Sequence, residues 1–352
     1  MRRSHRGYSG YRGRRTSTDV LRIVAVALGA LVVLAAAALF YVQNYLVYTD
    51  DGVRVDLPFG LFREEDSLPD PGNVSVVERT QGDEASRDAP REPEAEPLAV
   101  LEVPLSAVLD GTAGRELEQA GANALAVELK DGSGRLAWRS EQPLAELAGV
   151  NGDEAVNRAL EALEADGVAV IARLTCFRDD AAPYYDTAVA LRSGQGNWRD
   201  ELGLRRMSPA SPEARDYLAG LCGELAALGV DEIVLEQAAF PAAGELSLIN
   251  RDGNYDPDQF AGQMEAFLGQ VSEALAPYGA ALSLRLEGEE LSRPEDSGLT
   301  AALAGRFAAR VWVRAGALTV GQTALLGGED KLVSIVDRLE ERASGAQAFL
   351  LS

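Results

Sequence analysis

The sequence predicts an α/β fold, a TIM-like (β/α)8 barrel, preceded by one transmembrane helix and a disordered acidic linker. Three observations predict it: an uncharged apolar run near the N-terminus, a proline-rich acidic stretch after it, and alternating strand-like and helical segments in residues 98–352. Repeated βα units imply a parallel sheet. A (β/α)8 barrel typically takes about 250 residues, which matches the length of the alternating part.

The N-terminal segment has the pattern of a membrane anchor. Residues 1–22 contain seven arginines against one acid, Asp19. The apolar run that follows, residues 23–42, is 20 residues long, which is enough to cross the hydrocarbon core of a bilayer. We therefore predict a transmembrane helix at 23–48, with the N-terminus cytoplasmic and the rest extracytoplasmic. The alternative is a signal peptide cleaved near Ala35–Ala38.

A linker separates this segment from the folded part. Proline, acids and small polar residues dominate residues 64–97. Such a composition has little to bury and stays extended through charge repulsion and proline. The predicted domains are a basic cytoplasmic tail (1–22), a transmembrane helix (23–48), a juxtamembrane and acidic proline-rich linker (49–97), and an extracytoplasmic barrel (98–352).

The elements of the barrel follow from hydrophobic periodicity and from helix start and stop signals. Ser211-Pro212 and Asp256-Pro257 each read as a cap followed by proline in the first turn. Strands are predicted at Ala99–Val103, Ala124–Lys130, Val168–Phe177, Asp231–Glu236, Ala281–Glu287, Arg310–Arg314 and Gln347–Leu351. Helices are predicted near Gly114–Ala120, Asp153–Asp166, Pro212–Leu228, Pro257–Ala276, Gly298–Phe307 and Asp330–Ala343.

Composition excludes several function classes. The net charge is -22, whereas nucleic-acid binding normally needs a basic surface. The single histidine, His5, lies in the tail, so the barrel can hold no histidine triad and no His-ligated metal. Cys176 and Cys222 are too few for a zinc-thiolate site and are expected as separate buried thiols, with a disulfide as the alternative. No metal and no cofactor is expected.

The predicted strands carry charged residues on one face, because side chains alternate along a strand. The opposite, apolar face must meet the helices, so the charged face looks into the barrel or its C-terminal mouth. One interpretation is a polar ligand site or active site at the mouth. The other is an ion-pair network that plugs the barrel. The charged residues are Glu102, Glu128, Lys130, Arg173, Glu236, Arg285, Glu287 and Arg314.

Four segments carry a family resemblance: NALAVELKDGSGRLAW (123–138), VAVIARLTCFRDD (168–180), NWRDELGLRRMSP (197–209) and ELAALGVDEIVLEQAAFP (224–241). Through them the chain resembles a bacterial glycoside hydrolase domain family of unknown function, a barrel related to the α-amylase-like enzymes. The fourth-strand motif of that family usually reads Phe-Asp-Tyr-x-Arg-Phe-Pro. Here Glu236 replaces the aspartate, Gln237 the tyrosine and Ala239 the arginine, and Arg285 stands where the next strand typically carries an aspartate.

The resemblance implies a carbohydrate site at the mouth. Hydrolysis needs two carboxylates, about 5–5.5 Å apart for retention or about 6.5–9.5 Å for inversion. The motif departures and the surrounding cations, which lower carboxylate pKa values in general, favour a degenerate barrel that binds a cell-envelope polysaccharide or an envelope protein. The alternative is an active hydrolase that uses Glu236 with Glu287 or Glu128. The predicted catalytic candidates are Glu236, Glu287 and Glu128, and the predicted substrate-binding residues are Lys130, Asp131, Arg173, Trp198, Arg285 and Arg314.

Overall fold

The chain divides into two units, residues 1–89 and residues 90–352. In the first unit, strands β1 (Leu46–Thr49) and β2 (Gly52–Val55) form an antiparallel pair. The second unit holds all the other elements. The computed structural model describes residues 46–49, 52–55, 97–286, 294–314, 319–336 and 347–350.

The predicted membrane helix falls mostly outside the described residues. Only its last three residues, 46–48, are described, and they belong to strand β1 rather than to a helix. Val47, Tyr48 and Thr49 are β-branched or aromatic, which are the residue types that fit a pleated strand. Within the described residues, no helix has both the length and the apolar character that crossing a membrane requires. The predicted linker likewise lies largely outside the described residues.

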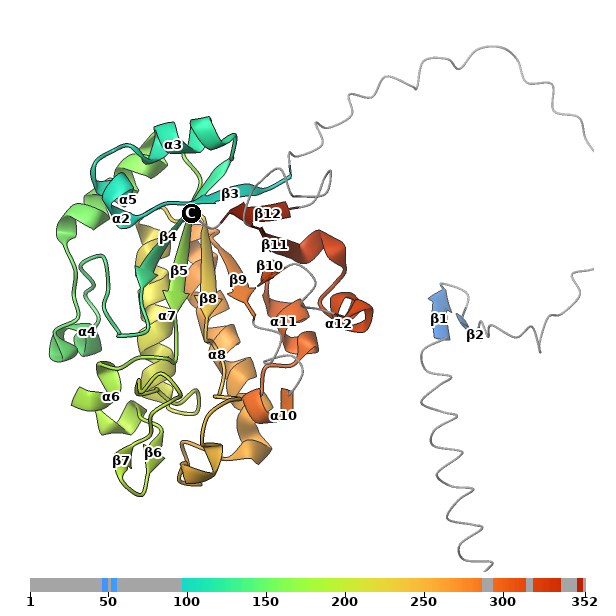
Figure 1. The fold of residues 1–352 in the computed structure, drawn as a ribbon. Helices are drawn as coiled ribbons and strands as arrows, with labels where there is room; N and C mark the ends of the chain where they lie inside the picture. Colours follow the sequence, from blue (N-terminus) through green and yellow to red (C-terminus); the bar gives the residue numbers. More distant parts are fainter. Residues whose placement is uncertain are drawn as a thin grey trace, which may run out of the picture. The chain divides into compact units, whose positions relative to one another are not determined.

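Eight parallel strands form the centre of the second unit (Figure 1). They close into a barrel in the order β10-β11-β12-β3-β4-β5-β8-β9, and every neighbouring pair is parallel. This agrees with the predicted α/β class and TIM-like architecture. The barrel strands are β3 (Ala99–Glu102), β4 (Ala124–Lys130), β5 (Val170–Thr175), β8 (Glu232–Glu236), β9 (Ala281–Arg285), β10 (Arg310–Arg314), β11 (Leu332–Val336) and β12 (Gln347–Leu350).

Helices and short loops connect the strands. Helix α7 shows why the sequence folds as it does: the Ser211 side chain accepts from the Ala214 amide at its N-cap, and Pro212 occupies the first turn. A small β6–β7 hairpin (Arg192–Ser193 and Gly196–Asn197) follows β5. The α-helices are α2 (Leu105–Leu109), α3 (Ala113–Ala120), α4 (Pro143–Ala148), α5 (Glu154–Ala165), α6 (Ala182–Tyr185), α7 (Pro212–Ala227), α8 (Phe260–Leu275), α10 (Pro294–Ser297), α11 (Ala301–Phe307) and α12 (Val320–Leu325). The 3-10 helices are η1 (Thr187–Val189), η2 (Leu246–Leu248), η3 (Pro257–Gln259), η4 (Ala276–Tyr278) and η5 (Glu329–Lys331).

One predicted element is wrong. We predicted a helix near Asp330–Ala343, but Leu332–Val336 forms strand β11, and residues 337–343 lie outside the described residues. This strand pairs with β10 on one side and β12 on the other, so it closes the barrel. Val333 and Ile335 lie in the barrel interior, and three of the four residues Val-Ser-Ile-Val are β-branched, which fits a pleated strand better than a helix. Tertiary pairing therefore overrides the helical interpretation of this segment.

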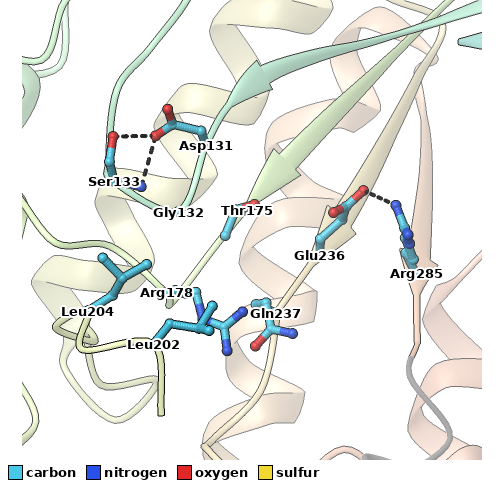
Figure 2. Close-up of a pocket in the computed structure, with 10 residues that line it drawn as sticks. All are labelled: Asp131, Gly132, Ser133, Thr175, Arg178, Leu202, Leu204, Glu236, Gln237 and Arg285. Carbon is cyan, nitrogen blue, oxygen red and sulfur yellow. Dashed lines mark hydrogen bonds and ion pairs between the residues drawn. The ribbon is translucent and has the colours of Figure 1, made fainter. Parts of the chain in front are cut away.

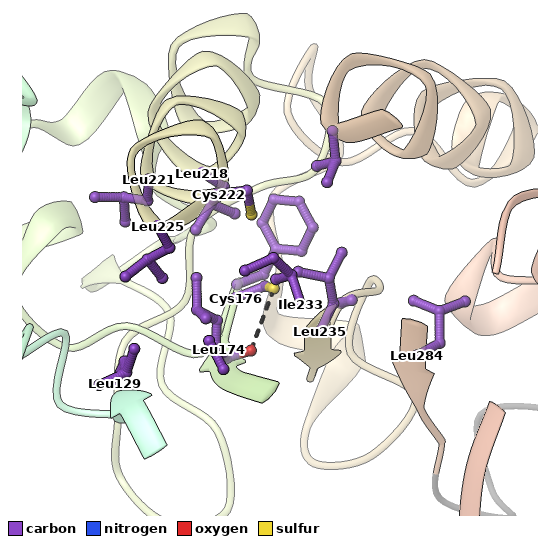
Figure 3. Packing of buried hydrophobic residues seen from close by; sticks show 14 of the residues in the cluster. Leu129, Leu174, Cys176, Leu218, Leu221, Cys222, Leu225, Ile233, Leu235 and Leu284 are labelled. Carbon is purple, nitrogen blue, oxygen red and sulfur yellow. Dashed lines mark hydrogen bonds between the residues drawn. The ribbon is translucent and has the colours of Figure 1, made fainter. Parts of the chain in front are cut away.

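The two faces of the strands pack differently, as predicted. Leu125, Val127 and Leu129 join the large apolar cluster between the sheet and the helices. Figure 3 shows part of this cluster, where side chains of α7 meet those of β5 and β8. The lower barrel interior is filled by a smaller apolar cluster of Val100, Ala124, Ala126, Ile171, Val234, Trp312, Val333 and Ile335. At the N-terminal end of the barrel, buried Glu232 pairs with Arg310 and accepts from Nε1 of Trp312, while the predicted charged residues Glu102, Arg173, Glu236 and Arg285 lie toward the C-terminal end.

Candidate functional site

Two hollows open at the C-terminal ends of the strands, where TIM barrels hold their active sites. The first hollow has a volume of about 370 Å³ and the second about 440 Å³. Asp131, directly after β4, lines both. The first hollow is lined by Asp131, Gly132, Ser133, Thr175, Arg178, Leu202, Leu204, Glu236, Gln237 and Arg285 (Figure 2). The second is lined by Glu102, Val103, Pro104, Leu105, Glu128, Leu129, Asp131, Arg135, Leu136 and Ala137.

Arg173 of β5 organises the charges at this mouth. Its Nε donates to Oε1 of Glu236 at 2.5 Å, and its Nη1 forms an ion pair with Glu102. Arg285 of β9 donates through Nη1 to the same Oε1 of Glu236 at 3.2 Å, a contact drawn in Figure 2. Four of the predicted charged residues are thus brought together, from strands β3, β5, β8 and β9.

Pairing explains how these charges can lie inside a barrel. Arg173 is only 8% exposed, and a buried charge needs partners to offset its lost hydration. Burial lowers the pKa of Arg173, but the hydrogen bond and charge of Glu236, with the charge of Glu102, outweigh burial and raise it overall. The predicted ion-pair network therefore exists. It does not fill the mouth, because both hollows remain open beside it.

Glu128 of β4 is the contrasting carboxylate. It lies beside Arg173 in the strand register and is exposed, and its carboxylate forms no hydrogen bond or ion pair with any residue that the structure describes. Partial loss of hydration at the mouth is the largest influence on its pKa and raises it. Arg173 acts in the opposite direction, and the carboxylate of Glu236 raises the pKa of Glu128 further. Glu128 thus keeps a proton to a higher pH than an ordinary glutamate.

The predicted position of Lys130 at the barrel mouth is wrong. We predicted that it shares the mouth-facing side of β4 with Glu128, but it is fully buried. A bulge shifts the register, so that Glu128 pairs with Arg173 while Lys130 pairs with Leu174. The extra residue breaks the alternation of faces and turns Lys130 toward the helices, on the side where Leu174 packs. There its Nζ pairs with Asp179 at 2.9 Å and donates to the Thr175 carbonyl at 2.8 Å, out of reach of a ligand.

The predicted position of Trp198 is also wrong. We predicted that it lines the sugar site, but it is only 3% exposed. Its ring packs in the main apolar cluster, and its Nε1 donates to the Glu245 carbonyl at 3.2 Å. A loop on the catalytic side of a barrel can be folded back on itself, and here the indole stabilises that loop instead of facing the mouth.

The remaining predicted residues are placed as follows. Asp131 lines both hollows, and its Oδ1 accepts from the Ser133 amide at 2.8 Å and from the Ser133 hydroxyl at 2.6 Å (Figure 2). Arg314 ends β10 with an exposed side chain and is not among the described lining residues of either hollow. Glu287 lies outside the described residues, so its predicted role stays a prediction.

Sequence reasoning missed Arg178. It lines the first hollow, where its Nε donates to Asp200 at 2.6 Å and its Nη2 to Glu201 at 2.8 Å. The available signal was its position three residues beyond β5, at the end of the barrel where functional loops gather.

Gln237 departs from the family motif, and its backbone conformation is also unusual. It is the one non-glycine described residue with positive φ, at 49°. A strained φ is tolerated where surroundings hold it, and such positions cluster at functional sites. Arg206 donates through Nη1 to the Gln237 side-chain oxygen at 3.0 Å, which fixes the turn directly after Glu236.

The donors and acceptors at this mouth suit a polar, hydroxyl-rich ligand. Carboxylates accept and guanidinium groups donate, both in planar arrays, while Leu202 and Leu204 supply apolar surface. Among the residues that the structure describes, no group of three or more His, Cys, Asp or Glu side chains is placed to hold a metal ion.

The chain is similar to several solved structures, and the one with a TM-score of 0.50 supports the fold. The glycoside hydrolase domain of PgaB (BpsB) from Bordetella bronchiseptica matches with a TM-score of 0.50 at 14% identity, over 68% of this chain and 84% of that chain. A hypothetical protein from Ruminiclostridium thermocellum matches with a TM-score of 0.45 at 24% identity, over 52% of this chain and 96% of that chain. The pneumococcal StrH matches with a TM-score of 0.47 at 10% identity, over 72% of this chain and 70% of that chain.

No curated protein matches the chain. The sequence profile of one family does match, over residues 115–305, which is more than half of the chain. That range contains the bulged strand β4, the ion-paired residues Arg173, Glu236 and Arg285, and the loop with Arg178. By this match the chain belongs to the family described as "Putative glycosyl hydrolase domain".

Proposed function

We propose that this protein is a membrane-anchored, extracytoplasmic, degenerate glycoside-hydrolase-like barrel that binds a cell-envelope polysaccharide. The observation that carries the proposal is the state of Glu236, which stands at the carboxylate position of the family motif. One of its oxygens accepts from both Arg173 and Arg285, while two open hollows lie beside it. A ligand can enter, but the motif carboxylate is held by the protein itself.

This arrangement disfavours the chemistry that hydrolysis asks of Glu236. Its Oε1 already accepts from Arg173 and Arg285, so a general acid at this position would have to share its carboxyl group with both guanidinium groups. As a nucleophile or base it would act from a carboxylate whose charge is already shared with two guanidinium groups. Binding a sugar without hydrolysing it does not require a free carboxylate. Paired charges around a hollow can still form hydrogen bonds with sugar hydroxyls.

A carbohydrate as ligand is supported by the family and by the fold shared with the PgaB glycoside hydrolase domain. Membrane anchoring and the extracytoplasmic position rest on the sequence: the arginine-rich tail 1–22, the apolar run 23–42 and the acidic linker. In cells, the full-length chain should stay with membranes after alkaline carbonate extraction, and the barrel should be digested by protease added to spheroplasts. Release by carbonate, or protection from protease, would contradict the anchored arrangement.

A second function, glycoside hydrolysis, is favoured by one specific observation. Glu128 is unpaired among the described residues, and its pKa is raised by partial desolvation and by Glu236, as a proton donor requires. In that mechanism Glu128 would donate the proton and Glu236 would act as nucleophile or base. Both carboxylates would then be essential for turnover.

Calorimetry of the full-length chain against purified envelope polysaccharides, combined with an assay for new reducing ends, separates the two functions. We expect saturable binding without reducing ends in the wild type and in Glu236→Gln. The matched control is Glu161→Gln, an exposed glutamate on α5, which should bind as the wild type does.

Turnover in the wild type that is lost in both Glu236→Gln and Glu128→Gln would establish the hydrolase and overturn the degenerate interpretation. No binding to any glycan would overturn both functions. Specific capture of an envelope protein would then identify that protein as the partner.

A further inference from the structure

Helix α6 presents two neighbouring aromatic side chains to solvent. Tyr184 is 62% exposed and Tyr185 is 53% exposed. Their ring centroids are 5.0 Å apart and their planes meet at 85°, so the rings form a right-angled corner. Leu202 is also exposed, and α4, which packs beside α6, carries exposed Leu147. Burying large apolar groups is favourable, so a group of them left at the surface marks a place that a partner covers.

Arg205 links this corner to the loop that lines the first hollow. Leu202 and Leu204 line that hollow, and the next residue, Arg205, places its guanidinium carbon 4.9 Å from the centre of the Tyr184 ring. On the other strand of the loop, Arg178 lines the hollow and only three residues separate it from α6. Figure 2 shows Arg178, Leu202 and Leu204 together beyond the C-terminal end of β5. We call Tyr184, Tyr185, Leu202 and Arg205 the aromatic shelf.

Hydrogen bonds hold the aromatic shelf in place. Arg205 donates through Nη1 to the Asp180 carbonyl at 2.8 Å and to Asp180 Oδ1 at 2.9 Å. Arg199 donates to the same Oδ1 at 3.1 Å, and the side-chain Nδ2 of Asn197 donates to the Pro183 carbonyl within α6. A surface that is fixed before binding loses less conformational entropy when a ligand arrives.

We propose that the aromatic shelf is an outer sugar-binding subsite, which takes the part of a polysaccharide that extends beyond the first hollow. This inference rests on the proposed carbohydrate-binding function. It adds the direction in which the bound polysaccharide extends from the barrel mouth. Sugar rings have an apolar C–H face that packs on an aromatic ring, and hydroxyls around the rim that need planar polar partners. The tyrosine rings supply the first, and Arg199, Arg205 and Asp180 supply the second.

A folded protein partner fits this surface less well. Stable protein interfaces bury about 800 Å² on each side, with charged residues depleted at their centre. The aromatic shelf is a corner of two rings bordered directly by charged side chains. A narrow, hydroxyl-rich chain matches both its size and its rim.

The test measures how affinity depends on ligand length. The full-length wild type and the Tyr184→Ala/Tyr185→Ala variant are titrated against an array of bacterial envelope oligosaccharides, each in a form of two or three sugars and a form of six to eight. We expect the wild type to prefer the long form of its ligand by about tenfold, which corresponds to the worth of one or two aromatic contacts. The variant should bind both lengths equally, with the affinity for the short form unchanged.

Two further variants control the experiment. Tyr184→Phe/Tyr185→Phe keeps both rings and should keep the preference for length. Tyr278→Ala removes a tyrosine that is 54% exposed at the end of η4, just before β9 and at the opposite end of the barrel from the mouth. This variant should bind both ligand lengths as the wild type does. If the alanine variant binds the long form as tightly as the wild type, the aromatic shelf is not a subsite, and the proposed function still stands. If the wild type binds no glycan, the proposed function and this inference both fail.

Discussion

Two sets of ion pairs come from neighbouring strands of this barrel, and they differ in how far they reach the surface. Lys130 and Asp179 are closed off, with side-chain exposures of 0% and 1%. Glu236 and Arg285 are 15% and 23% exposed and border the first hollow. The closed pair ties β4 to the loop after β5, whereas the open set is the one that we propose to contact a ligand. Of the two sets, only the partly exposed one borders a hollow.

The closed pair should show the largest effect on stability. Lys130→Met leaves the Asp179 carboxylate buried without its cation, and it removes the donor to the Thr175 carbonyl. Breaking a buried pair from one side typically costs about 3–5 kcal/mol. We expect a loss of that size in the free energy of unfolding, measured by denaturant titration. The double variant Lys130→Met/Asp179→Asn removes both charges and should recover much of the loss. A cost below about 1 kcal/mol for the single variant would contradict the structural role.

The open set should cost less to break. In Glu236→Gln, Arg173 keeps its pair with Glu102, and Arg285 can be hydrated at the mouth. Hydrogen bonds to charged groups contribute about 1.5–3 kcal/mol, and partial exposure reduces that figure, so we expect a loss of about 1–2 kcal/mol by the same titration. A loss equal to that of Lys130→Met would remove the distinction between the two sets.

Glu128→Gln should have the smallest effect, and its sign should be opposite. The pKa of Glu128 is raised in the folded protein, so its charged form costs stability, and that cost appears as the pH rises through its folded pKa. At pH 7 the variant avoids this cost, and because solvent screens this exposed side chain it should melt higher than the wild type by no more than about 1 °C. Below the ordinary glutamate pKa, both proteins are neutral at this position and the difference should vanish. Melting curves at pH 7 and pH 3.5 measure it, and a variant less stable at pH 7 would show that Glu128 is favourably paired.

The parts of the fold that depend on local pattern were predicted well. Strands Ala124–Lys130 and Arg310–Arg314 match the structure at both ends, and helix α7 begins at the predicted Pro212. These segments carry their own signals: alternation of apolar residues, or a cap followed by proline. Strand β11 was missed because Leu332–Val336 is short and flanked by residues that are typical of helices, and only its pairing with β10 and β12 makes it a strand.

The candidate site was predicted in part. Alternation of faces placed Glu102, Arg173, Glu236 and Arg285 on one side of their strands, and the structure joins them in ion pairs. The prediction from alternating faces failed at Lys130, because a one-residue bulge reverses the faces there. The sequence of β4 contains no signal for that bulge. It could not address Trp198, whose burial depends on how a long loop folds back onto the barrel.

By itself, the sequence determined the α/β class, the family and the residue types that meet at the mouth, because periodicity and motif spacing are properties of neighbouring residues. Only the tertiary structure decided which charges are partnered, which are closed off and which are open to a ligand. Ion pairing and burial depend on residues far apart in the chain, such as Arg173 with Glu102 and Glu236, and on the closure of the barrel that brings them together.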